Sequence, residues 1–152
     1  MKIIALIGSS DSGKTSTLNL VLQQLIGRGY QLNSYTQLGD LPEDFQATVS
    51  KNGVKIGIAT VGYFNSTQQP EKAEIAVGCK TTMEYIGDLD RENCHVVICC
   101  FSSPNNKKQI NPDISLLPVF NYKVVKSIST HENERLYLNQ QDAITIVQLI
   151  KV

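Results

Sequence analysis

Residues 8–15 combine glycines, a lysine and a threonine at a spacing that can hold an anion. The segment Gly8-Ser9-Ser10-Asp11-Ser12-Gly13-Lys14-Thr15 fits the pattern G-x-x-x-x-G-K-[ST] at every position. Glycine lets the backbone adopt positive φ and approach a ligand closely. Successive backbone amides in such a turn form a nest for an anion, and a following helix adds partial positive charge at its N-terminus. The pattern therefore predicts an anion-binding loop.

The flanking residues supply the elements that must position this loop. The apolar run Ile3–Ile7 predicts a buried strand before it. Leu18, Leu22 and Leu25 recur at i, i+4 and i+7, which predicts a helix from about Gly13 to Ile26. A strand before the glycine-containing turn and a helix after it are the structural context that supports an anion-binding function for this motif.

The stretch from about residue 2 to residue 26 resembles the Walker A motif of the P-loop containing nucleoside triphosphate hydrolase superfamily. The resemblance implies that Lys14 contacts the β- and γ-phosphates of a nucleoside triphosphate and acts as the catalytic residue. It also implies that the Thr15 hydroxyl ligates Mg²⁺. The alternative is a chance match, in which the loop has a purely structural role. The candidate phosphate-binding residues are Gly8, Ser9, Ser10, Asp11, Ser12, Gly13, Lys14, Thr15 and Ser16.

The chain departs from the superfamily pattern in its acidic residues and in its base-reading motif. A hydrophobic strand should end in Asp or Glu to hold Mg²⁺, but the expected strands at 54–60 and 94–101 end without a carboxylate. Asp11, Asp40 and Asp44 are candidate substitutes, acting directly or through water. No Asn-Lys-x-Asp sequence for guanine is present, which disfavours a regulatory GTPase and leaves ATP as the default nucleotide.

Further candidates follow from the rule that ligands of open α/β sheets bind beyond the carboxyl ends of the strands. Thr60, Ser102 and Ser103 are the best placed, because they stand at the ends of expected strands. Arg28 and Arg91 are expected at the opposite end of the sheet, away from the carboxyl ends of the strands. The only arginine that could act as an arginine finger in cis is therefore Arg135, and Lys107 or Lys108 could substitute for it in part as point charges. The full set is Thr60, Tyr63, Asn65, Ser102, Ser103, Asn105, Lys107, Lys108, Thr130, His131 and Arg135.

The order of the expected elements predicts a single α/β domain over residues 1–152. We expect a mostly parallel sheet flanked by helices, similar to P-loop NTPases, with an antiparallel β-hairpin at 45–60. Asn52-Gly53 between two strand-like segments favours a type I′ turn. The other expected elements are strands at 30–36, 94–101 and 122–129 and helices at 82–92 and 139–151, with 71–77 left open between helix and extended chain.

Composition limits the classes of partner. The chain has 152 residues, with 14 basic and 14 acidic side chains, so it lacks the general electrostatic footprint of a nucleic-acid-binding protein. No apolar stretch approaches the roughly 20 residues of a membrane-spanning helix. The four cysteines, Cys79, Cys94, Cys99 and Cys100, show no metal-binding spacing and are interpreted as buried free thiols, which suits a reducing cytoplasm.

The leading interpretation is a protein that binds a nucleoside triphosphate with Mg²⁺ and hydrolyses the γ-phosphate slowly. A small nucleotide or metabolite kinase is an alternative, which the single-domain layout suits but the scarcity of arginine (three residues) opposes. A second alternative is a non-enzymatic, nucleotide-responsive module that binds a protein partner, and the missing acid favours it. Whether the chain is an enzyme is left open by the sequence.

Overall fold

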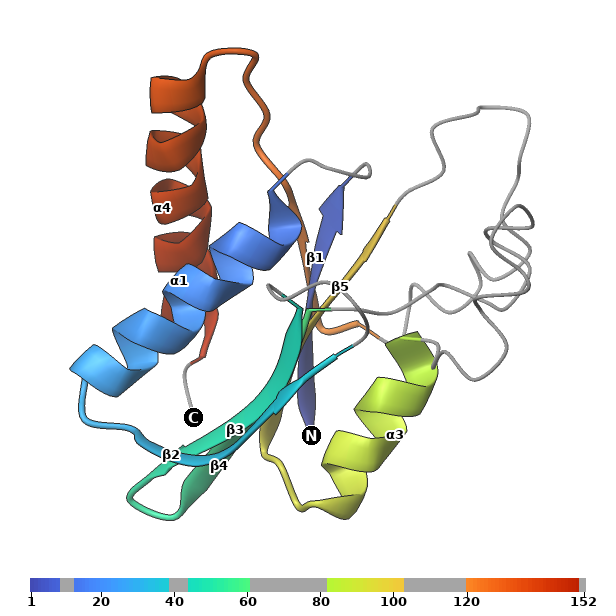
Figure 1. Cartoon of the computed structure of the whole chain (residues 1–152). Coiled ribbons are helices and arrows are strands. Elements are labelled where there is room, and N and C mark those ends of the chain that lie inside the picture. Colours follow the sequence, from blue (N-terminus) through green and yellow to red (C-terminus); the bar gives the residue numbers. More distant parts are fainter. Residues whose placement is uncertain (9–12, 39–43, 61–81, 103–119, 151–152) are drawn as a thin grey trace.

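The computed structural model describes residues 1–8, 13–38, 44–60, 82–102 and 120–150, apart from the side chains of residues 101 and 102. The described elements are helices and strands of one α/β arrangement (Figure 1). In order they are β1 (Lys2–Gly8), α1 (Lys14–Gly27), β2 (Gln31–Gln37), β3 (Phe45–Lys51), β4 (Val54–Ala59), α3 (Thr82–Arg91), β5 (Val96–Ser102), β6 (Tyr122–Val125) and α4 (Glu132–Leu149). Strands β2, β3 and β4 thus follow one another along the chain.

The strands form one six-stranded mixed sheet in the order β2-β3-β4-β5-β1-β6. The neighbours β4–β5, β5–β1 and β1–β6 are parallel, whereas β2–β3 and β3–β4 are antiparallel. The predicted α/β class and the predicted hairpin at 45–60 are confirmed. Asn52 and Gly53 both have positive φ, at 53° and 81°, as a type I′ turn requires.

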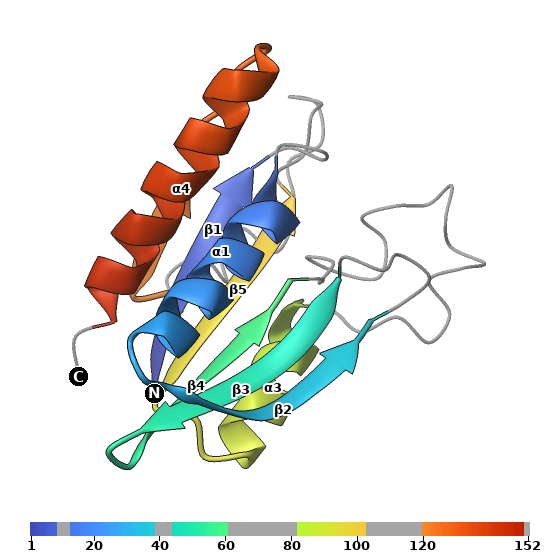
Figure 2. The ribbon, with the colours of Figure 1, turned by 60° about the vertical axis from the view of Figure 1, so that its left-hand side comes forward.

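Helices cover both faces of the sheet, with α1 and α4 on one face and α3 on the other (Figures 1 and 2). Successive residues of a strand point to opposite faces, so Ile4 and Leu6 of β1 pack with the apolar side chains of α1 and α4. Ile3 and Ala5 pack with the apolar face of α3. β1 is buried on both sides, which explains its continuous apolar sequence.

Two predicted boundaries are wrong by several residues. α4 begins at Glu132 instead of 139. Residues 132–137 are all exposed, so no apolar stripe marks this first part of the helix in the sequence. Glu132 and Glu134 in its first turn instead favour a helix start through the helix dipole. β6 ends at Val125 instead of 129. None of the helices within the described ranges is long and apolar enough to cross a membrane.

Candidate functional site

The motif residues that the structure describes lie at the junction between β1 and α1. Gly8 is the last residue of β1, and Lys14 is the first of α1. Gly13 has φ 92° and ψ 20°, a left-handed conformation that glycine adopts without strain. Its carbonyl accepts hydrogen bonds from the Thr17 backbone amide at 2.9 Å and the Thr17 hydroxyl at 2.8 Å. The predicted need for glycine at this position is therefore confirmed.

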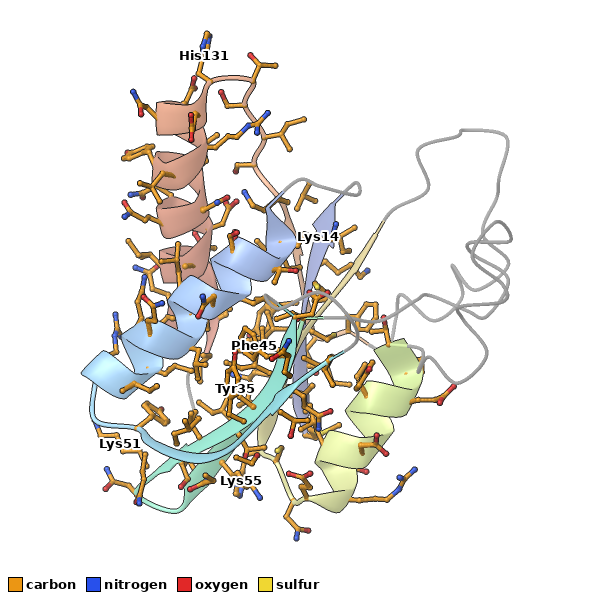
Figure 3. All side chains as sticks on the ribbon, in the orientation of Figure 1. Lys14, Tyr35, Phe45, Lys51, Lys55 and His131 are labelled. Atoms are coloured by element: carbon orange, nitrogen blue, oxygen red, sulfur yellow. The ribbon has the colours of Figure 1, made fainter. Side chains whose placement is uncertain are left out.

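Lys14 is held inside this junction rather than in solvent. Its side chain is 8% exposed, and its ammonium donates to the Gly8 carbonyl at 3.1 Å. Figure 3 shows the side chain where α1 begins, beside the end of β1. The lysine therefore connects the two ends of the loop, with its charge at the carboxyl end of β1.

The Thr15 hydroxyl donates to the carboxylate of Asp44 at 2.9 Å. The Thr60 hydroxyl lies 3.2 Å from the same Oδ1 atom and accepts the backbone amide of Phe45 at 2.9 Å. The topology explains this arrangement. β3 runs antiparallel to β4, so the residue before β3 meets the end of β4, at the edge where β1 also ends. Asp44 and Thr60 are thus brought to Thr15.

Cys100 completes the buried part of this cluster. It pairs with Leu6 in the β1–β5 register, and its thiol donates to the Thr60 carbonyl at 2.6 Å. Burial raises the pKa of Cys100 to about 12 from 9.0, while the Lys14 charge lowers it and the Asp44 charge raises it. The thiol is therefore neutral at physiological pH, and both site charges lie within electrostatic reach of it.

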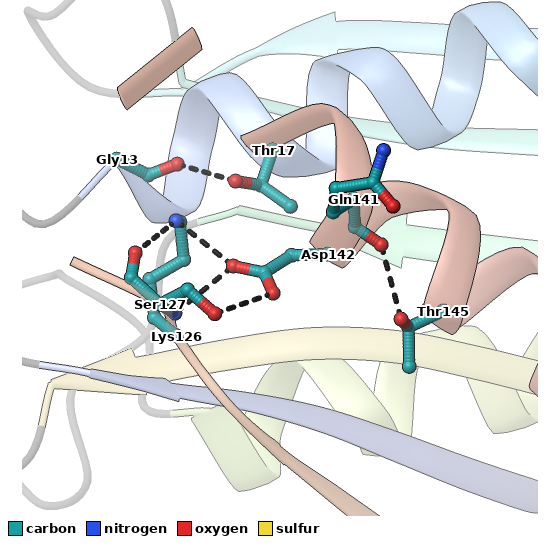
Figure 4. A network of polar contacts seen from close by, with 7 residues as sticks. All are labelled: Gly13, Thr17, Lys126, Ser127, Gln141, Asp142 and Thr145. Carbon is teal, nitrogen blue, oxygen red and sulfur yellow. Dashed lines mark hydrogen bonds and ion pairs between the residues drawn. The ribbon is translucent and has the colours of Figure 1, made fainter. Parts of the chain in front are cut away.

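A second helix, α4, packs beside the start of α1 and was not predicted as part of the site. The Asn139 side chain of α4 lies against Gly13, and a Cβ at Gly13 would stand 2.9 Å from Asn139 Oδ1. A buried ion pair holds this part of α4 (Figure 4): Lys126 Nζ and Asp142 Oδ2 are 2.9 Å apart. Asp142 also accepts the amide and hydroxyl of Ser127, each at 3.0 Å.

The sequence held one signal for this pair. This signal is Asp142, a charged residue within the largely apolar second half of the helix. Its partner, Lys126, is the residue directly after β6. The backbone amide of Lys126 donates to the Ile7 carbonyl at 2.7 Å, next to the start of the loop. The pair therefore connects α4 to β1.

The structure separates other candidates from this cluster. Arg135 donates from Nε to the Ser129 carbonyl at 2.8 Å within its own connection, and Thr130 and His131 are exposed beside it. Arg91 pairs with Asp88 at the far end of α3, and Arg28 follows the end of α1, both as expected. Ser16 is exposed in the first turn of α1. The candidates that lie outside the described residues are Ser9, Ser10, Asp11, Ser12, Asp40, Tyr63, Asn65, the Ser102 side chain, Ser103, Asn105, Lys107 and Lys108, together with Cys79 and residues 71–77.

Cys94, Cys99 and Cys100 are buried free thiols, as predicted. Within the described part of the chain, no group of three or more His, Cys, Asp or Glu side chains is arranged to hold a metal ion. Comparisons with protein-family models, with curated proteins and with solved structures found no match for this chain. The functional argument therefore depends on the geometry around the β1–α1 junction.

Proposed function

We propose that the chain is a P-loop-like protein that binds the phosphates of a nucleoside triphosphate, with Mg²⁺, at the β1–α1 junction and hydrolyses the γ-phosphate slowly. One observation supports this function above the others. An ammonium, a hydroxyl and a carboxylate, from Lys14, Thr15 and Asp44, converge where the glycine-containing loop enters α1. ATP is the default nucleotide.

Lys14 supplies the charge for the phosphates. Its ammonium donates a hydrogen bond to the neutral Gly8 carbonyl. When a phosphate binds, a charged phosphate oxygen takes the place of this carbonyl as the acceptor, and the hydrogen bond becomes charge-assisted and stronger. The amides of the first turn of α1 and the helix dipole favour the same anion. Because the side chain is already ordered and buried, binding costs little additional side-chain entropy.

The oxygen atoms beside Lys14 fit Mg²⁺. Thr15 Oγ1 and Asp44 Oδ1 are 2.9 Å apart, and adjacent ligands of an octahedral Mg²⁺, each about 2.0–2.1 Å from the ion, are also about 2.9 Å apart. Both are hard oxygen donors. When bound, Mg²⁺ neutralises charge on the phosphates during transfer. Asp44 would hold it in place of the acid that the superfamily carries at a strand end.

The same geometry favours slow turnover. Phosphoryl transfer is accelerated by positioned positive charge, but in the described residues no arginine reaches the junction, since Arg135 is engaged with Ser129. Thr60, not an acid, follows β4. This last observation also keeps a non-enzymatic, nucleotide-responsive module as the second candidate function.

The test compares nucleotide binding and phosphate release across matched variants. ATP and GTP are titrated with and without Mg²⁺ against the native chain, Lys14→Ala and Lys51→Ala, an exposed lysine at the far end of the hairpin. Loss of a charge-assisted contact should weaken binding by about ten- to a hundredfold in Lys14→Ala only. Asp44→Asn should remove the gain in affinity given by Mg²⁺ without weakening metal-free binding, and Asp90→Asn on α3 should do neither.

Each outcome selects one function. Mg²⁺-dependent binding with slow phosphate release supports the proposal. Tight binding with no release identifies a nucleotide-responsive module, and release that needs an added acceptor identifies a kinase. If no nucleotide binds, or if Lys14→Ala binds as tightly as the native chain, the proposed function is wrong.

A further inference from the structure

Strand β2 forms one edge of the sheet and differs from the strands beside it. Every residue of β2 is exposed, and Figure 2 shows the strand at the outer limit of the sheet. Its sequence, Gln31-Leu32-Asn33-Ser34-Tyr35-Thr36-Gln37, contains no charge and no proline. Proteins usually protect an edge strand with charge, proline or short length, because its unpaired backbone groups can pair with another strand.

The hydrogen bonds show which backbone groups of β2 face outward. The Leu38 amide donates to the Asp44 carbonyl at 2.9 Å, so these two residues form a hydrogen-bonded pair. Backbone groups alternate in direction along an antiparallel ladder. The next pair, Gln37 with Phe45, is therefore not hydrogen-bonded, and the backbone groups of Gln37 and Tyr35 point away from β3. Among the described strands, none lies on that side.

We propose that β2 pairs with β2 of a second copy of this chain, antiparallel and with the two-fold axis at Tyr35. In this register the outward amide and carbonyl of each Tyr35 bond to those of the other copy, and the two rings become cross-strand neighbours. Thr36 of each copy then lies opposite Ser34 of the other. Aromatic pairs and hydroxyl pairs across strands are both stabilising.

The neutral sequence favours a second copy over an arbitrary strand. In this register Tyr35 faces its own copy, and Ser34 and Thr36 face each other across the axis, so a charge at any of these three residues would lie near a like charge. β2 has no charge at these positions or elsewhere. Tyr35 is also fixed in place, since its ring stacks on Phe45 with the centroids 5.3 Å apart (Figure 3). The ladder is irregular between Leu32 and Ser34, which is why the pairing is centred in the second half of the strand.

The other edge of the sheet provides a contrast. β6 has only four residues and carries the exposed Lys123. An antiparallel self-pairing of so short a strand would bring two such lysines close together, and like charges across strands are destabilising. β6 is thus protected by length and charge, and β2 is the edge on which a dimer is expected. This inference does not depend on the proposed nucleotide binding.

The test measures the mass of the full chain by sedimentation from micromolar to submillimolar concentration. We expect a concentration-dependent dimer. Tyr35→Lys and Tyr35→Glu should each raise the dimer dissociation constant by about tenfold or more, because each variant places like charges opposite one another. A mixture of the two variants should form a heterodimer again. Tyr122→Lys, which changes an exposed aromatic residue on β6, should dimerise like the native chain.

Circular dichroism and thermal unfolding show whether each variant is folded, and the heterodimer requires that both are. A monomeric native chain over the whole range overturns the proposal. So does a dimer that Tyr122→Lys abolishes and Tyr35→Lys leaves intact. Variants at Tyr35 that dissociate but do not recombine as a mixed pair contradict the two-fold register.

Discussion

Substitution of Asp142 by alanine should destabilise the chain severely. The carboxylate pairs with Lys126, whose side chain is 1% exposed, and it accepts two bonds from Ser127. Removing one partner of a buried ion pair costs about 3–5 kcal/mol, a large share of the roughly 5–15 kcal/mol that stabilises a typical domain. With a urea m-value of about 2 kcal/mol/M, the midpoint of unfolding should fall by about 1.5–2.5 M.

A double substitution separates the lost pair from lost packing. Lys126→Met with Asp142→Leu removes both charges and keeps apolar volume, so it should recover most of the stability that Asp142→Ala loses. Urea unfolding followed by circular dichroism gives the midpoint for each variant. If Asp142→Ala shifts the midpoint by less than about 0.5 M at unchanged m, the pair is hydrated in solution and the reasoning is wrong.

Three further results follow from local contacts. Gly13→Ala should cost stability and weaken ATP binding, because φ at this position is 92° and the new methyl group would stand 2.9 Å from Asn139; titration calorimetry checks the binding. Gly57→Ala should lower the free energy of unfolding by about 1–3 kcal/mol, since its Cβ would lie 2.8 Å from a leucine methyl of α3, whereas Gly27→Ala, with nothing within 4 Å, should not. The native chain should lose stability as pH rises from 9.0 towards about 12, because the folded state keeps the Cys100 proton that the unfolded chain releases. Unfolding midpoints of the native chain and Cys100→Ala should converge over this pH range.

Local patterns predicted the region that surrounds the motif. The apolar run of β1, the helical period of α1 and the requirement for glycine at residue 13 are all short-range features, and each is observed. The Asn52-Gly53 turn is equally local, since two residues with positive φ specify it. Such features need no knowledge of the strand order.

The partners of the motif depended on the strand order, which the sequence does not encode locally. Asp44 was one of three acids that could substitute for the missing one, and nothing near it in sequence distinguishes it. It reaches Thr15 only because β3 is antiparallel to β4 and β5 lies between β4 and β1. Asn139 was missed for the same reason, because its contact with Gly13 joins residues at opposite ends of the chain.

Hydrogen exchange in the presence of ATP and Mg²⁺ tests the central claim most directly. If the β1–α1 junction holds the phosphates, saturating Mg-ATP should slow exchange at the backbone amides of Gly13 to Ser16, while the amides of α3 on the opposite face of the sheet stay unchanged. The amides should respond less to adenosine, which has no phosphate. Exchange that stays unchanged at Gly13 to Ser16 under saturating Mg-ATP would contradict phosphate binding at this loop.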